Sequence, residues 1–120
     1  MNSVLSIVAI AGLGAAGALV RLGLLHLFDR STLRSEYTTV VANIIGSAGA
    51  GFVIAADWGI WSWLLAAGLF GAFTTLSTLA VDVAQAFRGR MREGWSLLAW
   101  HIFGGLAGFL VGYLVASVAL

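Results

Sequence analysis

A patch of hydroxyl side chains interrupts an otherwise apolar segment, GLFGAFTTLSTLAVD, at positions 74–78. Four of these five residues carry a hydroxyl: Thr74, Thr75, Ser77 and Thr78. Two glycines precede the patch, and Gly, Thr and Ser favour a helix less than Leu or Ala does. The pattern favours a helix that breaks here, because freed backbone carbonyls are hard oxygen ligands that suit a small cation. A continuous helix with small, close-packing residues is the alternative.

A second polar pattern lies in VVANIIGSAGAGF, where Asn43, Ser47 and Gly51 recur every four residues. On a helix these three residues share one stripe. The stripe has two interpretations that the spacing alone does not separate. It either makes hydrogen bonds between helices, worth about 1 kcal/mol each, or lines a pore.

Charged and small residues mark two further segments. Arg21 follows GLGAAGALV in an apolar segment. A charged side chain in such a segment is usually functional, or else it reaches the membrane–water interface. In the last segment, His101 is expected to be an interfacial or packed residue rather than a ligand. Two sets of small residues predict close helix contacts: Gly14, Gly17 and Ala18, and Gly104, Gly108 and Gly112.

The elements that position these residues are predicted to be membrane-spanning helices. The chain has 120 residues, of which 61% are hydrophobic and 9% charged, and its mean hydropathy is +1.02. A bilayer crossing takes about 20 apolar residues, and four stretches are long enough: 4–27, 37–56, 60–87 and 95–118. We therefore predict a single all-α membrane domain over residues 1–120, with the third helix broken at mid-membrane. The first stretch lacks a basic start and is longer than the apolar part of a signal peptide, so we expect it to be retained.

Composition excludes several classes of function. The absence of Cys excludes disulfides and thiolate metal sites. Two His far apart in sequence disfavour a histidine metal site, and six basic residues are too few for a nucleic-acid surface. We predict no catalytic residues and no enzymatic activity.

The arginines are placed asymmetrically, which predicts orientation. Between the four stretches, one side has five arginines (Arg30, Arg34, Arg88, Arg90 and Arg92), whereas the other has Asp57 and no Lys or Arg. Positive residues favour the cytoplasm, so both termini are predicted to lie outside. Tryptophans at both ends of the stretches suit anchoring at the membrane interface: Trp58, Trp61, Trp63 and Trp95.

The order, spacing and length of these motifs resemble the small bacterial fluoride channels, the Fluc or CrcB family, along the whole chain. GAAGALVR is similar to the family's G-x-x-G-A-x-x-R, and TTVVANIIGSAGAG to its pattern around V-N-x-x-G. GAFTTLSTLAVD resembles the specific signature G-G-x-T-T-F-S-T-F-x-x-E, with Asp82 where the family usually has an acid.

The resemblance implies an antiparallel dimer of four-helix subunits that exports fluoride passively across the bacterial plasma membrane. It also implies a structural Na⁺ at the dimer interface, held by backbone oxygens from both subunits, with Gly71 and Thr74 as the ligands here. Arg21 would lie near a pore vestibule, and Asp82 would be a vestibule or structural charge. The positions expected along the fluoride path are Asn43, Leu76, Ser77, Thr78 and Leu79.

The sequence departs from the family pattern at two places, and these departures raise an alternative to fluoride conduction. Leu76 and Leu79 replace the two motif phenylalanines, whose electropositive ring edges border the anion path in the family. Where the family often has a track of Tyr and Ser in the last span, the comparable stripe reads Trp100, Gly104, Gly108 and Gly112. The main prediction is a fluoride channel subunit, and the alternative is a non-conducting or structural subunit of a heterodimeric channel. A small multidrug transporter ranks lower, because it needs an acid in the first span, where this chain has Arg21 and no acid.

The arginine asymmetry also bears on the partner. A chain that pairs with an inverted copy of itself must insert in both orientations, a dual topology that requires nearly balanced positive charge on the two sides. The imbalance here favours an antiparallel heterodimer with a related four-span subunit over a homodimer.

Overall fold

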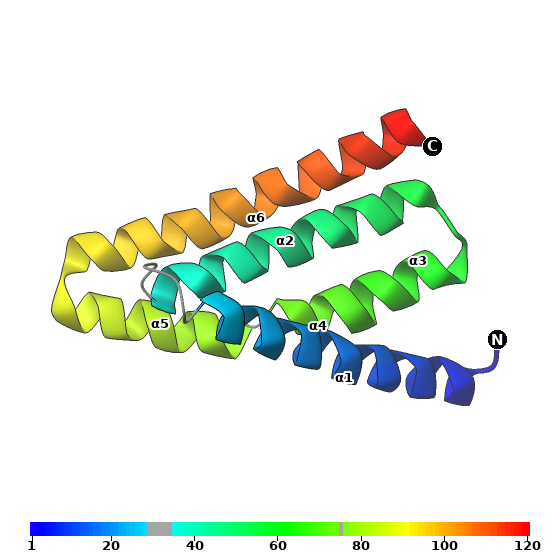
Figure 1. The fold of residues 1–120 in the computed structure, drawn as a ribbon, viewed down its shortest axis with the longest axis horizontal. Helices are drawn as coiled ribbons and strands as arrows, with labels where there is room; N and C mark the ends of the chain where they lie inside the picture. Colours follow the sequence, from blue (N-terminus) through cyan, green and yellow to red (C-terminus); the bar gives the residue numbers. More distant parts are fainter. Residues whose placement is uncertain (29–34, 75) are drawn as a thin grey trace.

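The computed structural model describes residues 1–28, 35–74 and 76–120, with the backbone alone at 35–36 and 76–78. Figure 1 shows a bundle of helices that run along the long axis of the molecule. The described elements are α1 (Ser3–Phe28), α2 (Ser35–Ala56), α3 (Ile60–Leu64), η1 (Leu65–Phe70), α4 (Gly71–Phe73), α5 (Leu76–Gly89) and α6 (Met91–Ala119). No strand occurs in these residues, so the predicted all-α class is confirmed.

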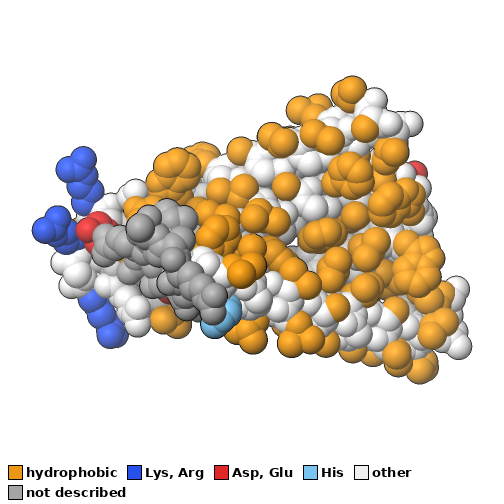
Figure 2. All heavy atoms as spheres, viewed as in Figure 1, with side chains coloured by type: hydrophobic (Ala, Val, Ile, Leu, Met, Phe, Trp, Pro, Cys, Tyr) orange, Lys and Arg blue, Asp and Glu red, His pale blue; other side chains and the backbone are white. Residues whose placement is uncertain are grey.

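Three helical stretches are long and apolar enough to cross a membrane: Ser3–Phe28, Tyr37–Ala56 and Met91–Ala119. A shorter apolar helix covers Ile60–Phe73 and consists of α3, η1 and α4. Large apolar side chains remain exposed along the molecule, as the orange surface of Figure 2 shows. Leu19 and Phe103, for example, are each 69% exposed. Such a surface is stable against lipid tails and costly against water.

We call α3, η1, α4 and α5 together the third helix. The helix α2 lies at the centre of the bundle, with α6 along one face and the third helix along another. Against α6, glycine brings the backbones into direct contact: a Cβ added at Gly108 would lie 2.7 Å from the Ile44 carbonyl oxygen. Gly112 faces the Ala48 carbonyl in the same way, and Gly51 faces that of Phe109. The close contact predicted from the glycines of the last span is confirmed.

The helix α1 makes a similar contact with the third helix. Gly17 faces the backbone of Leu69, and a Cβ on Gly68 would lie 2.9 Å from the Leu13 Cβ. Gly14 has more room, because its added Cβ would lie 3.9 Å from the nearest atom, the carbonyl oxygen of Gly68. The close approach expected in the first span therefore centres on Gly17.

The third helix is interrupted inside the hydroxyl patch, as predicted. The helix α4 ends at Phe73, Thr74 has extended dihedrals (φ −87°, ψ 136°), and α5 starts at Leu76. The interruption is shorter than the patch, since residues 76–78 are already helical. Directly before it, Leu65–Phe70 form a π-helix that the sequence did not predict. Single π-helical turns inside α-helices are rare and frequently lie at functional sites.

The connection between α5 and α6 is shorter than the gap between the predicted stretches 60–87 and 95–118. Helix α5 continues to Gly89, and α6 starts at Met91. Only Arg90 leaves the helical conformation (φ −138°, ψ 124°). The turn can be this tight because Gly94 leaves room for the Phe87 ring, which packs edge-on against Trp95 at 5.4 Å between centroids. In Figure 1, this turn lies at one end of the bundle, while both termini lie at the other.

Candidate functional site

At the interruption, Thr74 closes the preceding turn with both its backbone N–H and its hydroxyl. The Thr74 N–H donates to the Phe70 carbonyl (3.1 Å), and its hydroxyl lies within donating distance of the carbonyls of Phe70 (3.4 Å) and Gly71 (3.3 Å). On one side, α2 packs tightly against the interruption: a Cβ on Gly46 would lie 2.8 Å from Thr74 Cγ2 and 2.9 Å from Phe73 Cδ1. Gly71 is exposed.

This geometry gives the interruption a capacity to hold a cation. The carbonyls of the last turn of a helix have no helical donor, and a carbonyl that accepts one hydrogen bond keeps a second lone pair. Gly71 has no side chain to shield its carbonyl, and it is exposed in the single chain. These oxygens suit a hard cation such as Na⁺, but a full coordination shell needs further oxygens from outside the chain.

The predicted polar stripe of α2 faces α6. The Asn43 side-chain amide donates to the backbone carbonyl of His101 (3.1 Å). One turn further along α6, a Cβ added at Gly105 would lie 3.1 Å from Asn43 Nδ2 and 3.5 Å from Ser47 Oγ. We call Asn43, Ser47, His101 and Gly105 the polar seam. The seam shows that hydrogen bonding between helices, one of the two interpretations of the stripe, does occur.

His101 is a packed residue of the seam, one of the two roles that the sequence predicted for it. Its side chain is only 4% exposed, and neither ring nitrogen has a hydrogen-bond partner among the residues that the structure describes. An ionisable side chain within a span is functional by default.

The four residues of the stripe in the last span differ in exposure. Trp100 is 55% exposed. The buried face of α6 at this level consists of Leu97, at 3% exposure, and His101, followed by Gly108 and Gly112.

The other predicted site residues are only partly described. Arg21 is half-buried on α1, one turn beyond Gly17 and on the same face. Leu79 and Asp82 are half-buried on α5. Thr75 lies outside the described residues, as do the side chains of Leu76, Ser77 and Thr78. The structure does not bring Arg21 into the polar seam.

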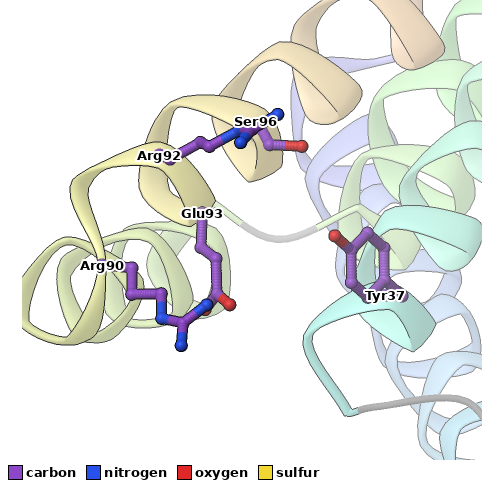
Figure 3. A pocket seen from close by; sticks show the side chains of 5 residues that line it. All are labelled: Tyr37, Arg90, Arg92, Glu93 and Ser96. Carbon is purple, nitrogen blue, oxygen red and sulfur yellow. The ribbon is translucent and has the colours of Figure 1, made fainter.

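The arginine-rich end of the bundle has a pocket of about 280 Å³. Its lining comes from the start of α2 and from the α5–α6 turn with the first turns of α6: Tyr37, Arg90, Arg92, Glu93 and Ser96. In Figure 3, Tyr37 stands across the pocket from the other four side chains. Figure 2 shows blue Arg side chains gathered at this end. Arg30 and Arg34, assigned to the same side, lie outside the described residues. Two guanidinium groups against one carboxylate attract anions to this end.

Comparison with known proteins places these features in a family. Residues 8–113 match the family described as CrcB-like protein, Camphor Resistance (CrcB). A protein named Fluoride-specific ion channel FluC 2, from Halalkalibacterium halodurans, is 37% identical over 97% of this chain and 89% of its own. Fluoride-specific ion channel FluC 1 of Parasynechococcus marenigrum is 31% identical over 87% of this chain and 88% of its own. Fluoride-specific ion channel FluC of Dichelobacter nodosus is 28% identical over 86% and 89%. The match runs from α1 through the interrupted helix to the glycines of α6, and the chain is a multi-pass membrane protein that belongs to the CrcB family.

Proposed function

We propose that this chain is a subunit of a passive fluoride channel in the bacterial plasma membrane, which lowers cytoplasmic fluoride and its toxicity. The proposal rests on relatives that are named fluoride-specific ion channels, one of which matches 97% of this chain at 37% identity. Fluoride enters cells as neutral HF and is trapped by ionisation. The membrane potential then drives the anion outward with about 2.3 kcal/mol per 100 mV, so an open path is sufficient and no enzymatic step is needed.

Fluoride efflux from liposomes tests this function. The chain is reconstituted alone and together with any related four-span protein from the same cell, and chloride efflux is the control. Fluoride efflux that exceeds chloride efflux supports the proposal. The absence of fluoride efflux from both preparations rejects it.

The proposed channel holds a structural Na⁺ at its dimer interface, with the backbone oxygens of Gly71 and Thr74 as ligands. The exposed Gly71 and the extended Thr74 support this, because they offer carbonyls to a neighbouring chain. A related chain across a two-fold axis would offer equivalent oxygens a second time and complete the shell. Bound there, Na⁺ would supply the positive charge that holds the interrupted helices of two subunits together.

The proposed dimer is antiparallel, and a heterodimer is favoured over a homodimer. Arg88, Arg90 and Arg92 lie at the opposite end of the bundle from Asp57 and the termini, which favours one orientation for this chain. Some relatives carry numbered names, FluC 1 or FluC 2, which is consistent with two related chains. Reporters fused to the C-terminus test this: a signal on the external side alone supports the heterodimer, and equal signals on both sides reject it.

The second candidate function is a structural subunit that does not line a conducting path. Leu79, half-buried on α5, favours this candidate because a leucine offers no ring edge to an anion. If this second function is correct, fluoride crosses the heterodimer only along surfaces of the other subunit. Substitutions in the polar seam would then leave fluoride efflux unchanged while substitutions in the partner abolish it.

A further inference from the structure

The pocket at the arginine-rich end of the bundle adjoins a second hollow along α6. The pocket of about 280 Å³ is lined in part by Ser96. The second hollow, of about 240 Å³, shares Ser96 and is otherwise lined by apolar side chains: Ala99, Trp100 and Phe103. Because one residue lines both, the two hollows form one continuous feature. We call it the amphipathic groove, since it is charged at the end of the bundle and apolar farther along α6.

The groove residues of α6 follow one stripe of that helix. Arg92 and Ser96 are four residues apart, and the apolar lining residues continue at the spacing that keeps helical side chains on one face. The helix rises roughly 16 Å from Arg92 to Phe103. The hydrocarbon core of one leaflet is about 15 Å thick. The groove is therefore as long as one leaflet is thick, with its charges at the level of the lipid headgroups.

The charged part of the groove suits a phosphodiester. Two guanidinium groups, Arg90 and Arg92, stand against the one carboxylate of Glu93, which leaves one net positive charge. Guanidinium groups bind phosphate oxygens through paired N–H donors. The hydroxyls of Tyr37, across the pocket in Figure 3, and Ser96 are further donors. One net positive charge matches the single charge of a phosphodiester better than the nearly doubled charge of a phosphate monoester.

The apolar part of the groove is open to lipid tails. Trp100 and Phe103 are 55% and 69% exposed, and Ala99 is exposed as well. Among the described elements, α6 contacts α2 and α5 but neither α1 nor α4. A hollow between such side chains gives an acyl chain more van der Waals contact than a flat helix surface does. The same groove thus offers a charge match to a headgroup and a surface for its tail.

We propose that the amphipathic groove binds an anionic phospholipid of the cytoplasmic leaflet, such as phosphatidylglycerol. The phosphodiester contacts the guanidinium groups of Arg90 and Arg92. One acyl chain lies along Ala99, Trp100 and Phe103. Basic pockets between transmembrane helices on the cytoplasmic side bind anionic headgroups in this way, and the arginines assign the groove to that side. The inference does not depend on the proposed function, since it needs only a protein that spans the bilayer.

Native mass spectrometry of the purified protein, with its dimer partner where one is required, measures individual bound lipids. The protein in detergent micelles is titrated with dioleoyl-phosphatidylglycerol or with dioleoyl-phosphatidylethanolamine, which has the same acyl chains and no net charge. We expect phosphatidylglycerol to bind at least about fivefold more tightly, since one basic residue near an anionic headgroup contributes about that factor. Equal affinity for the two lipids overturns the proposal.

Arginine variants separate the groove from the general positive charge of this end. Arg90→Gln and Arg92→Gln should each lower the affinity for phosphatidylglycerol about fivefold and change the affinity for phosphatidylethanolamine less. The matched control is Arg88→Gln, which removes the same charge from the exposed last turn of α5 but does not line the groove. It should keep the wild-type affinity. An equal loss in Arg88→Gln means that the lipid follows surface charge alone, and it overturns the site.

A bulky substitution tests the apolar part of the groove. Ala99→Phe fills the hollow from an exposed position and should weaken phosphatidylglycerol binding. Val111→Phe, exposed on α6 about two turns beyond Phe103, should not. Unchanged binding to Ala99→Phe, or displacement of the lipid by an equal concentration of glycerol 3-phosphate, makes this a site for free phosphate and rejects the lipid. The same spectra report the mass of the assembly, so loss of the dimer in Ala99→Phe assigns this face to a second subunit and also rejects the proposal.

Discussion

A series of Gly→Ala substitutions should separate steric contact between helices from the general effect of replacing glycine. Gly112→Ala would place a methyl group 2.7 Å from the Ala48 carbonyl carbon and 3.0 Å from its Cα. Both are backbone atoms, so α2 and α6 would have to separate by roughly 1 Å to restore ordinary contact distances. Overpacking of this kind typically costs about 1–3 kcal/mol.

Two matched substitutions calibrate that value. Gly12→Ala adds its methyl group to open space on α1 and reports the helix propensity alone, worth about 0.5–1 kcal/mol in favour of alanine. At Gly104, the nearest atom is the tip of a flexible side chain, Ile44 Cδ1 at 2.8 Å, which can move aside. The expected order of destabilisation is Gly112→Ala above Gly104→Ala, with Gly12→Ala neutral or slightly stabilising.

Unfolding in mixed micelles, followed by helical circular dichroism at one protein concentration, measures this series. A fixed concentration is required because a dimer gains stability from association. A gap of about 1–3 kcal/mol between Gly112→Ala and Gly12→Ala corresponds to a factor of about 5 to about 150 in the unfolding constant. Equal stability of these two variants, or a larger loss for Gly104→Ala than for Gly112→Ala, would refute the packing of α2 against α6 described above.

Three further predictions concern the interruption and the anion path. Gly46→Ala places a methyl group 2.8 Å from Thr74 Cγ2 and should lower fluoride efflux, because it displaces the interruption. Gly23→Ala adds its methyl group to open space and should leave fluoride efflux unchanged. Equal efflux from the two variants would contradict this prediction. Leu76→Phe combined with Leu79→Phe should preserve folding and raise fluoride efflux, because the two rings offer their edges to an anion. Unchanged efflux would argue against a fluoride path lined by these two positions. Replacing Na⁺ by N-methylglucamine should lower the thermal stability of the dimer, measured by size-exclusion chromatography after heating, and a dimer indifferent to Na⁺ would exclude the proposed cation site.

The sequence predicted the helical elements well because their signal is strong and local. Apolar runs of about 20 residues define the long helices, and α1 (Ser3–Phe28) and α2 (Ser35–Ala56) differ from the predicted stretches by only one or two residues at their ends. The α5–α6 turn was harder to predict, because no proline marks it and three arginines made it look like a longer loop. Its tightness depends on the contact of Phe87 with Trp95, which sequence spacing does not show.

The candidate site was predicted less evenly. The interruption at Thr74 could be predicted because glycine and hydroxyl residues lower helix propensity together. The π-helix before it could not, since Leu65–Phe70 has an ordinary helical composition. His101 was expected to be either interfacial or packed, and the structure shows it packed at 4% exposure. The sequence could not decide between these two roles, because several glycines of α6 allow contact and the neighbouring Trp100 could have faced α2 instead.

The helix α2 connects the two parts of the candidate site, and this arrangement explains its unusual composition. One face uses Gly46 to contact the interruption at Thr74, while the adjacent face uses Asn43 to bind the His101 carbonyl. Because both contacts are close, a shift of α2 toward one neighbour moves it away from the other. The proposed cation site and the polar seam are therefore mechanically linked through one helix. A structural Na⁺ that fixes the interrupted helix would also fix the distance between Asn43 and α6, and so the spacing of the donors along the polar seam.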